Sequence, residues 1–230
     1  MKDFSEFKNK TGFEFKNTDF LKEALTHRSY LNENPAWTHP HNERLEFLGD
    51  AVIELIITEE LFKKFPASPE GDLTSLRAAL VNANMLSEIS AKLDFGDFLL
   101  LSRGEAKDRG RARQYILANA FEAVVGAIYL DGGYDKAKKF LDKNLLPELP
   151  KIITGKLYQD PKSLFQEKAQ EFSAITPHYE VIKEWGPDHD KHFVVGVFLT
   201  DDKVAEGEGP SKQTAQEEAA RIALEVKNWA

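Results

Sequence analysis

The sequence contains no cysteine. Disulfide bonds, thiolate zinc sites and cysteine nucleophiles are therefore excluded. The first residues also lack the apolar run of a signal peptide, and no stretch free of polar side chains approaches the roughly 18 residues that a membrane span needs. We therefore expect a cytoplasmic protein with no membrane segment.

An excess of positive charge is missing as well. The chain has 30 basic and 38 acidic residues and a formal net charge of -8, which argues against a general polyanion binder. A cluster of carboxylates that binds a divalent cation would itself add negative charge, so whole-chain charge does not settle the matter. With 42% hydrophobic and 30% charged residues, the 230-residue chain has the composition of a globular protein with one large domain or two unequal ones.

The first part of the chain, residues 18–146, has the periodicity of successive helices. The longest predicted helix follows Asn42, a good N-cap residue, and extends to about Phe65, where Pro66 stops it. A second covers 114–130 and ends at a stop signal with two glycines. Shorter helical patterns cover 20–30, 73–82, 85–93 and 134–145. Because no period of two is sustained, we expect an all-α domain.

The pattern changes after residues 146–160, where two prolines and a glycine predict a linker. Beyond it the order is helix, three strands and helix, at 163–172, 178–184, 193–200, 203–208 and 212–226. That order predicts a three-stranded antiparallel sheet with two helices on one face. We therefore expect an all-α domain over 1–150, a linker over 151–159 and a small α+β (α-β-β-β-α) domain over 160–230.

Three acidic residues share one face of the long helix after Asn42. Glu43, Glu46 and Asp50 have the spacing i, i+3 and i+7, which places them within an arc of roughly 60°. Apolar residues continue the same row, which predicts that the acids are partly buried. The alternative is a solvated acidic face, the commoner explanation of an acidic pair.

The second long helix has almost no polar side chains. Between 116 and 130, only Asn119 and Glu122 are strongly polar apart from one tyrosine hydroxyl. A helix that is apolar on nearly all sides is buried, and a buried carboxylate needs a partner. That partner is a basic side chain, or a cation shared with the acids of the first helix. Oxygen ligands without cysteine or a histidine pair favour Mg²⁺ over Zn²⁺. The alternative is a hydrogen-bonded polar pair that fixes helix register.

The segment 41–50, HNERLEFLGD, closely resembles the signature of ribonuclease III, a family of endonucleases that cut double-stranded RNA. The segment 24–30 and the end of the second helix at 129–133 extend the resemblance. The α-β-β-β-α segment resembles a double-stranded RNA-binding domain, so essentially the whole chain is covered. The resemblance implies a homodimer in which two sites cut both strands and leave 5′-phosphate and 3′-hydroxyl ends. It leaves the natural substrates open between ribosomal RNA precursors and messenger hairpins.

The resemblance also implies a metal site. It assigns Mg²⁺, for which Mn²⁺ can substitute, to Glu46, Asp50, Asn119 and Glu122, with Asp50 and Glu122 as the catalytic pair. Glu43 and Glu70 match further acidic positions near the cleft. The chain departs from the family at Asn119, where aspartate is usual; an amide offers a carbonyl oxygen but no charge, so we expect weaker metal binding. A cleavage-impaired double-stranded RNA-binding protein is the alternative to an active enzyme.

The predicted RNA contacts lie at three places in the C-terminal domain. The resemblance assigns them to Ser163, Gln166, Glu167 and Gln170 on the first helix, His189 in the hairpin loop and Lys212 at the start of the last helix. From residue 157 onward the chain has 14 acidic and 8 basic residues, a net charge of -6. Because duplex RNA is recognised mainly by shape and 2′-hydroxyl contacts, this charge permits binding, with low affinity and a shallow salt dependence.

Overall fold

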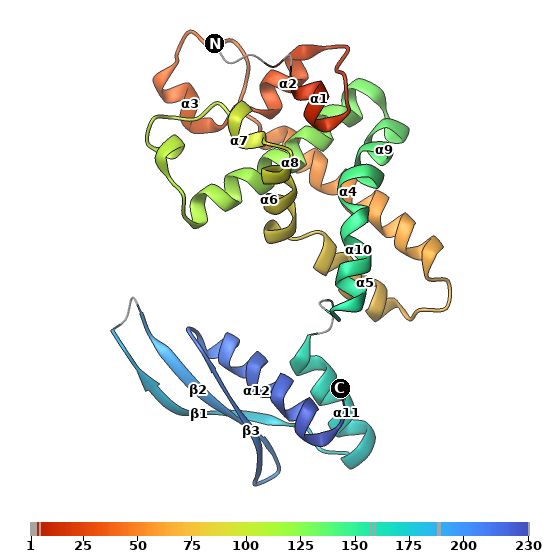
Figure 1. Ribbon diagram of the computed structural model, residues 1–230, viewed down its shortest axis with the longest axis vertical. Coiled ribbons are helices and arrows are strands. Elements are labelled where there is room, and N and C mark those ends of the chain that lie inside the picture. The colour runs from red at the N-terminus through yellow and green to blue at the C-terminus, as the bar shows by residue number, and fades with distance from the viewer. Residues whose placement is uncertain (1–3, 5, 157, 159, 188–189, 230) are drawn as a thin grey trace. The chain divides into compact units, whose positions relative to one another are not determined.

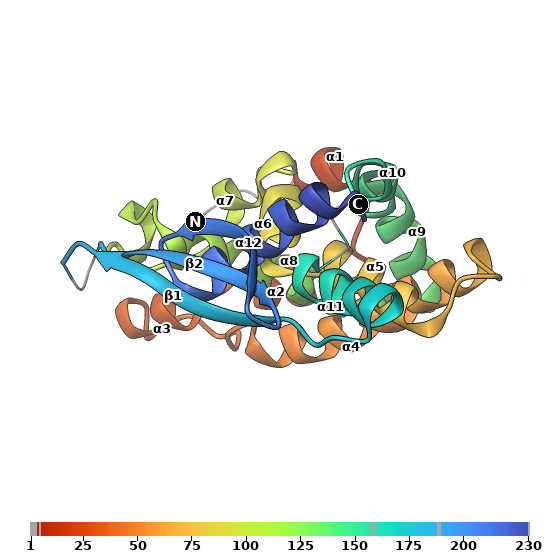
Figure 2. The ribbon, with the colours of Figure 1, turned by 90° about the horizontal axis from the view of Figure 1, so that it is seen from below.

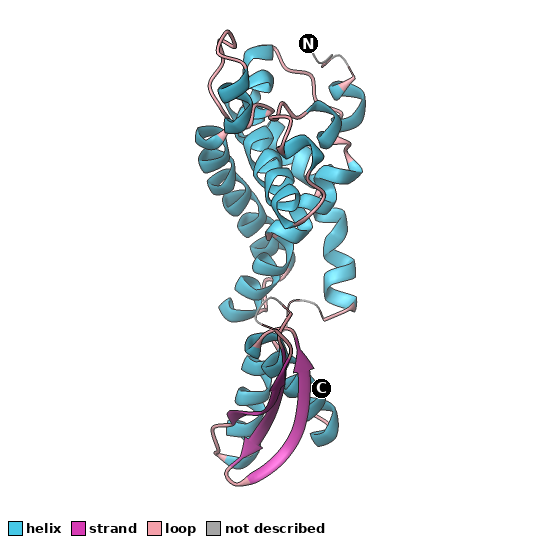
Figure 3. Ribbon diagram, turned by 90° about the vertical axis from the view of Figure 1, so that its left-hand side faces the viewer, coloured by secondary structure: helices cyan, strands magenta, loops and turns pink. Residues whose placement is uncertain are grey.

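The chain folds into two compact units. The computed structural model describes all residues except 1–3, 5, 157, 159, 188–189 and 230. The units are Met1–Tyr158, built from helices, and Gln159–Ala230, which contains the sheet (Figure 1). All three strands of the described residues belong to the second unit (Figure 3). This confirms the predicted fold class of an all-α domain followed by a small α+β domain.

The longer helices of the first unit follow the predicted pattern, whereas the helix predicted over 20–30 is wrong and the short helices Phe7–Thr11, Phe95–Phe98 and Leu149–Thr154 were not predicted. They are α1 Phe7–Thr11, α2 Thr18–Ala24, α3 Arg28–Glu33, α4 Glu43–Lys64, α5 Glu70–Leu80, α6 Ala83–Lys92, α7 Phe95–Phe98, α8 Arg111–Gly132, α9 Tyr134–Asn144 and α10 Leu149–Thr154, with 3-10 turns η1 Glu105–Lys107 and η2 Leu146–Glu148. The single helix predicted over 20–30 is wrong, because His27 has extended backbone and its side chain accepts the Ser29 N–H as the N-cap of α3.

The predicted linker also begins too early. Residues 151–154 belong to α10, and Ile152 is only 1% exposed within the core of the first unit. Pro150 lies in the first turn of this helix, where a proline is compatible with helical backbone and helps to start a helix. The other domain limits stay a prediction.

The two 22-residue helices α4 and α8 form the centre of the first unit. They make the most extensive contact between any two elements of the described chain. Their fully buried residues include Ile53 and Ile57 of α4 and Phe121, Val124 and Val125 of α8. The expected apolar character of α8 is thus confirmed. None of the helices in the described part is long and apolar enough to cross a bilayer.

The close approach of α4 and α8 depends on two glycines. A Cβ atom on Gly49 would lie 1.7 Å from the carbonyl oxygen of Glu122. A Cβ atom on Gly126 would lie 2.3 Å from the carbonyl oxygen of Leu45. Real Cβ atoms do not come so near to backbone, so only glycine permits the two backbones to touch here. The crossing point is therefore determined by these two positions.

The second unit has the predicted order of elements. It consists of α11 Pro161–Ser173, β1 His178–Trp185, β2 His192–Leu199, β3 Asp202–Gly209 and α12 Lys212–Lys227. The strands are antiparallel in the order β1-β2-β3 and lie side by side (Figure 2). Helix α12 packs on β2 and β3, and α11 packs on α12. A small core that includes Phe165, Val197 and Ala219 joins the two layers.

The glycine contact makes Gly126→Ala a direct test of the helix crossing. The added methyl group overlaps the backbone of α4, and relief requires separation of the two central helices. We expect a loss of about 2 kcal/mol or more in the free energy of unfolding. Gly71→Ala in α5 is the matched control, because nothing lies within 4 Å of its Cβ position. Thermal or urea unfolding compares them, and a Gly126→Ala protein as stable as the control would contradict the close crossing.

Candidate active site

The helix crossing brings the predicted metal ligands together. Glu46 and Asp50 lie on α4 on either side of Gly49, and Asn119 and Glu122 lie on α8, whose backbone touches Gly49 at Glu122. The side chain of Asn119 donates a hydrogen bond to Glu46. Two helices that are distant in the sequence thus contribute two oxygen-bearing side chains each to one place.

The carboxylates of the two helices interact electrostatically. Burial raises the pKa of Glu122 to about 7, with further contributions from the negative charges of Asp50 and Glu46. Burial and the charge of Glu43 also raise the pKa of Glu46, while the Asn119 hydrogen bond opposes the rise. Without a cation, the site therefore disfavours the full negative charge of its carboxylates.

The donor set fits a hard divalent cation. Glu46, Asp50, Asn119 and Glu122 offer only oxygen ligands, which suit Mg²⁺ or Mn²⁺. A divalent ion would also offset the repulsion that raises the pKa of Glu122. Among the described residues, no three His, Asp or Glu side chains stand close enough to form a ready-made metal cage. The carboxylates thus interact electrostatically without yet sharing one ligating position.

The two supporting acids lie in different places. Glu43, in the first turn of α4, is a charged neighbour of Glu46 and lies 3.4 Å from a guanidinium nitrogen of Arg28. Glu70 begins α5, where its carboxylate accepts a hydrogen bond from the Thr74 hydroxyl over 2.9 Å. The structure therefore brings Glu43 to the site, and no recorded contact among the described residues joins Glu70 to it.

The start of α4 is fixed by Asn42 in an unexpected way. Asn42 is the N-cap residue, but its side chain makes no capping hydrogen bond. It is 3% exposed, and its amide donates to the Ala24 carbonyl over 3.3 Å, while its backbone N–H donates to the Thr26 carbonyl over 2.9 Å. The predicted capping role of the Asn42 side chain is wrong, because this side chain joins the start of α4 to the last residue of α2 instead. The position of Glu46 depends on this anchor.

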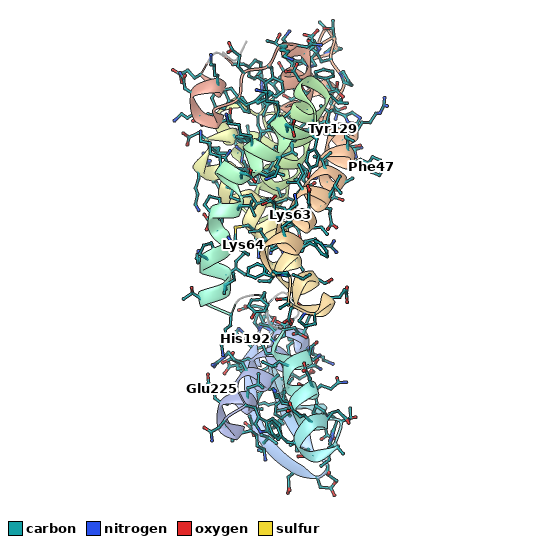
Figure 4. The ribbon with its side chains drawn as sticks, turned by 90° about the vertical axis from the view of Figure 1, so that its right-hand side faces the viewer. Phe47, Lys63, Lys64, Tyr129, His192 and Glu225 are labelled. Atoms are coloured by element: carbon teal, nitrogen blue, oxygen red, sulfur yellow. The ribbon has the colours of Figure 1, made fainter. Side chains whose placement is uncertain are left out.

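Sequence patterns missed the apolar surface beside the carboxylates. Phe47 is 82% exposed and projects from α4 (Figure 4). Leu130, near the end of α8, is 49% exposed. Both line a pocket of about 600 Å³ that also includes Glu43. The sequence did contain a signal for this surface, because Phe47, the aromatic residue next to Glu46, lies outside the buried apolar row of α4. The two crossing glycines were missed too, although isolated glycines inside long helices indicate close packing.

The predicted RNA contacts of the second unit are exposed where they are described. Ser163, Gln166, Glu167 and Gln170 are all exposed on α11, and Lys212 is exposed in the first turn of α12. The two helices meet near their first turns, where the Lys162 ammonium donates to the side-chain oxygen Oε1 of Gln216 over 2.6 Å. His189 lies outside the described residues.

Comparisons with known proteins cover both units of the chain. A family model described as Ribonuclease-III-like matches residues 17–149, and one described as Double-stranded RNA binding motif matches 161–227. The chain is 45% identical to Ribonuclease 3 of Nitratiruptor sp. over 98% of its length and 97% of the relative, and 44% identical to Ribonuclease 3 of Sulfurovum sp. over 98% and 99%. The solved nuclease domain of ribonuclease III from Campylobacter jejuni is 40% identical, with a TM-score of 0.58 over 64% of this chain and 99% of that chain. The chain therefore belongs to the ribonuclease III family of double-stranded RNA endonucleases.

Proposed function

We propose that this protein is a Mg²⁺-dependent endonuclease that hydrolyses phosphodiesters in both strands of double-stranded RNA, with Mn²⁺ as a working substitute. The products carry 5′-phosphate and 3′-hydroxyl ends. The observation that carries the proposal is the convergence of Glu46, Asp50, Asn119 and Glu122 at the α4–α8 crossing. In the same chain, the second unit matches a motif that binds double-stranded RNA.

Each of the four side chains has a distinct role in this proposal. Asp50 and Glu122 are the catalytic pair that the family resemblance implies, and the charge of Asp50 on α4 acts on Glu122 on α8. Glu46 completes the charged set, and Asn119 orients it through their hydrogen bond. When bound, Mg²⁺ lowers the pKa of a coordinated water and neutralises charge on the leaving 3′ oxygen. The two helices place these groups at one crossing, so that small side-chain movements would let them share a cation.

The amide at position 119 is compatible with an active enzyme. Its NH₂ group donates to Glu46, which leaves its carbonyl oxygen available to a hard cation. The missing charge lowers metal affinity, while the three carboxylates that carry the site's charge are present. The alternative of a cleavage-impaired RNA-binding protein rests on Asn119 alone, and membership of an endonuclease family speaks against it.

The exposed apolar surface beside the site supports a homodimer. Phe47 and Leu130 lie on the same side of the first unit as Glu43, and large exposed apolar side chains beside a functional site mark an interface. The related Campylobacter jejuni structure is described as containing a region involved in dimer formation. A twofold pair would place two sites against one duplex, so that each site cuts one strand.

The second unit supplies duplex recognition through a polar face. Ser163, Gln166, Glu167 and Gln170 offer hydroxyl, amide and carboxylate groups to a minor groove, and Lys212 offers a charge to a phosphate at the start of α12. His189 completes the predicted contacts from the hairpin loop. We place the activity in the cytoplasm on ribosomal RNA precursors and messenger hairpins; sequencing the RNA ends that disappear on deletion of the gene would test these substrates.

Sedimentation equilibrium of the intact chain tests the dimer. We expect one species near twice the 26.0 kDa chain mass at micromolar concentration, because burial of Phe47 and Leu130 stabilises the pair. Phe47→Ala should shift the equilibrium to the monomer, whereas Phe172→Ala, which removes a 60% exposed ring from α11, should not. A wild-type monomer at assay concentration would contradict the twofold arrangement.

Cleavage of a long RNA duplex in Mg²⁺ tests the enzyme. We expect short fragments with 5′-phosphate ends, and Glu122→Gln should lower the rate about 100-fold or more because it removes a charged metal ligand. Glu88→Gln, at an exposed carboxylate on α6, is the control and should leave the rate unchanged. Asn119→Asp should raise the rate most at low Mg²⁺, because it adds a charged ligand.

The outcomes separate the enzyme from its rival. Duplex binding without cleavage by the wild type, in Mg²⁺ and in Mn²⁺, would support the cleavage-impaired RNA-binding protein. Cleavage that survives both Glu122→Gln and metal chelation would remove the proposed metal site from the mechanism. Gel-shift binding by Glu122→Gln, measured in parallel, shows whether the variant has lost chemistry alone.

A further inference from the structure

A second pocket lies in the first unit, apart from the carboxylate site. Its volume is about 890 Å³, and it is formed by the segment 11–16, the end of α8 and one face of α9. None of its lining residues belongs to the predicted metal or RNA sites. Its nearest link to them is α8, along which Asp131 lies nine residues, or about 14 Å, beyond Glu122.

The acidic residues of this pocket are all engaged. Glu14 forms an ion pair with Lys8 over 2.7 Å. Asp131 accepts the backbone N–H groups of Lys16 and Asn17 over 2.9 and 2.8 Å. Asp142 pairs with the Lys138 ammonium over 2.8 Å. The carboxylates of the pocket are therefore already satisfied by hydrogen bonds and ion pairs.

Four lysines of the pocket have no such partner. Within the described part of the chain, no ion pair or hydrogen bond is recorded for the ammonium groups of Lys16, Lys136, Lys139 and Lys143. Four unmatched cations around one pocket stand out in a chain whose formal net charge is -8. Such a local excess of positive charge favours a ligand with several negative charges.

The lysines are directed across the pocket by the packing of α9. Lys136, Lys139 and Lys143 have the spacing i, i+3 and i+7 and so share one face of the helix. The Lys143 ammonium lies 2.5 Å from the position of a Cβ atom on Gly12, where φ is +74°. The Cγ atom of Lys136 lies 2.7 Å from the Cβ position of Gly132. Glycines thus leave the room that the lysine side chains occupy over the pocket wall.

The pocket also has an aromatic wall. Phe13 is half-buried, and its ring packs edge-on against Phe15 at a centroid distance of 4.8 Å. An unpaired base can stack on such a ring, whereas the bases of duplex RNA are stacked inside the helix. The pocket volume also falls within the usual range of small-molecule sites, about 300–1,000 Å³. Charge, aromatic wall and size together favour a single nucleotide with a polyphosphate.

We propose that this pocket is a binding site for a nucleoside triphosphate. The phosphates contact Lys136, Lys139 and Lys143, and the base lies against Phe13. The site is independent of the proposed cleavage function, because it shares no residue with the carboxylate cluster.

Isothermal titration calorimetry of the intact protein with ATP tests the site, in EDTA and at low ionic strength. We expect one ATP per chain. Lys139→Gln combined with Lys143→Gln should weaken binding about tenfold or more, because two charge-assisted contacts are lost. Lys63→Gln combined with Lys64→Gln makes the same charge change at the exposed end of α4 and is the matched control (Figure 4). Its affinity should stay within about twofold of the wild type.

Two further titrations separate the phosphate and base contacts. Tripolyphosphate should bind more weakly than ATP. The Phe13→Leu variant should bind ATP more weakly than the wild type does, with its affinity for tripolyphosphate unchanged. The proposal would be overturned if the wild type did not bind ATP, or if the two double lysine variants lost ATP affinity equally. The proposal would also be overturned if a 30-base-pair RNA duplex displaced ATP and the double variant Lys139→Gln, Lys143→Gln bound that duplex more weakly than the wild type does. The lysines would then belong to an RNA-binding surface. Circular dichroism confirms that each variant is folded.

Discussion

The contact of Gly49 with the backbone of α8 is the constraint on which the site depends. It lets α4 and α8 cross with their backbones touching, and the same crossing carries Glu46 and Asp50 toward Asn119 and Glu122. A larger residue at Gly49 or Gly126 would hold the helices apart by the width of a methyl group or more. Glu122 would then lose part of the burial, and of the proximity to Asp50 and Glu46, that raises its pKa, and the carboxylates would lose the proximity that a single cation requires.

Much of the fold could be predicted from the sequence because its local signals agree with its tertiary structure. The apolar row of α4, the stop at Pro66 and the strand pattern after 178 all match the observed elements. The failures occurred where a tertiary contact decides the backbone. The helix predicted over 20–30 is broken because the backbone of Leu25 and His27 pairs with Leu100, a partner far along the chain. The prolines of 146–160 predicted a linker from residue 151, although Pro150 lies in the first turn of α10, whose burial depends on packing that no local pattern reveals.

The sequence indicated which side chains the structure brings to the α4–α8 crossing, but it did not indicate their geometry. The spacing of Glu46 and Asp50 indicated that these acids are partly buried. Asn119 and Glu122 are isolated in an apolar helix, which indicated that they too are buried and need polar or charged partners. The helix crossing, and the hydrogen bond from Asn119 to Glu46, depend on how α4 and α8 pack. The exposed ring of Phe47 and the lysine pocket beside α9 are surface features made by several segments, so sequence periodicity alone does not reveal them.

Anomalous diffraction from crystals soaked in Mn²⁺ tests the central claim most directly. The account predicts one strong peak at the α4–α8 crossing, at about 2.0–2.3 Å from oxygen atoms contributed by both helices. The ligands should include Glu46 or Asp50 on one side and Asn119 or Glu122 on the other. A peak ligated by only one helix, or Mn²⁺ bound elsewhere with the crossing empty, would contradict it.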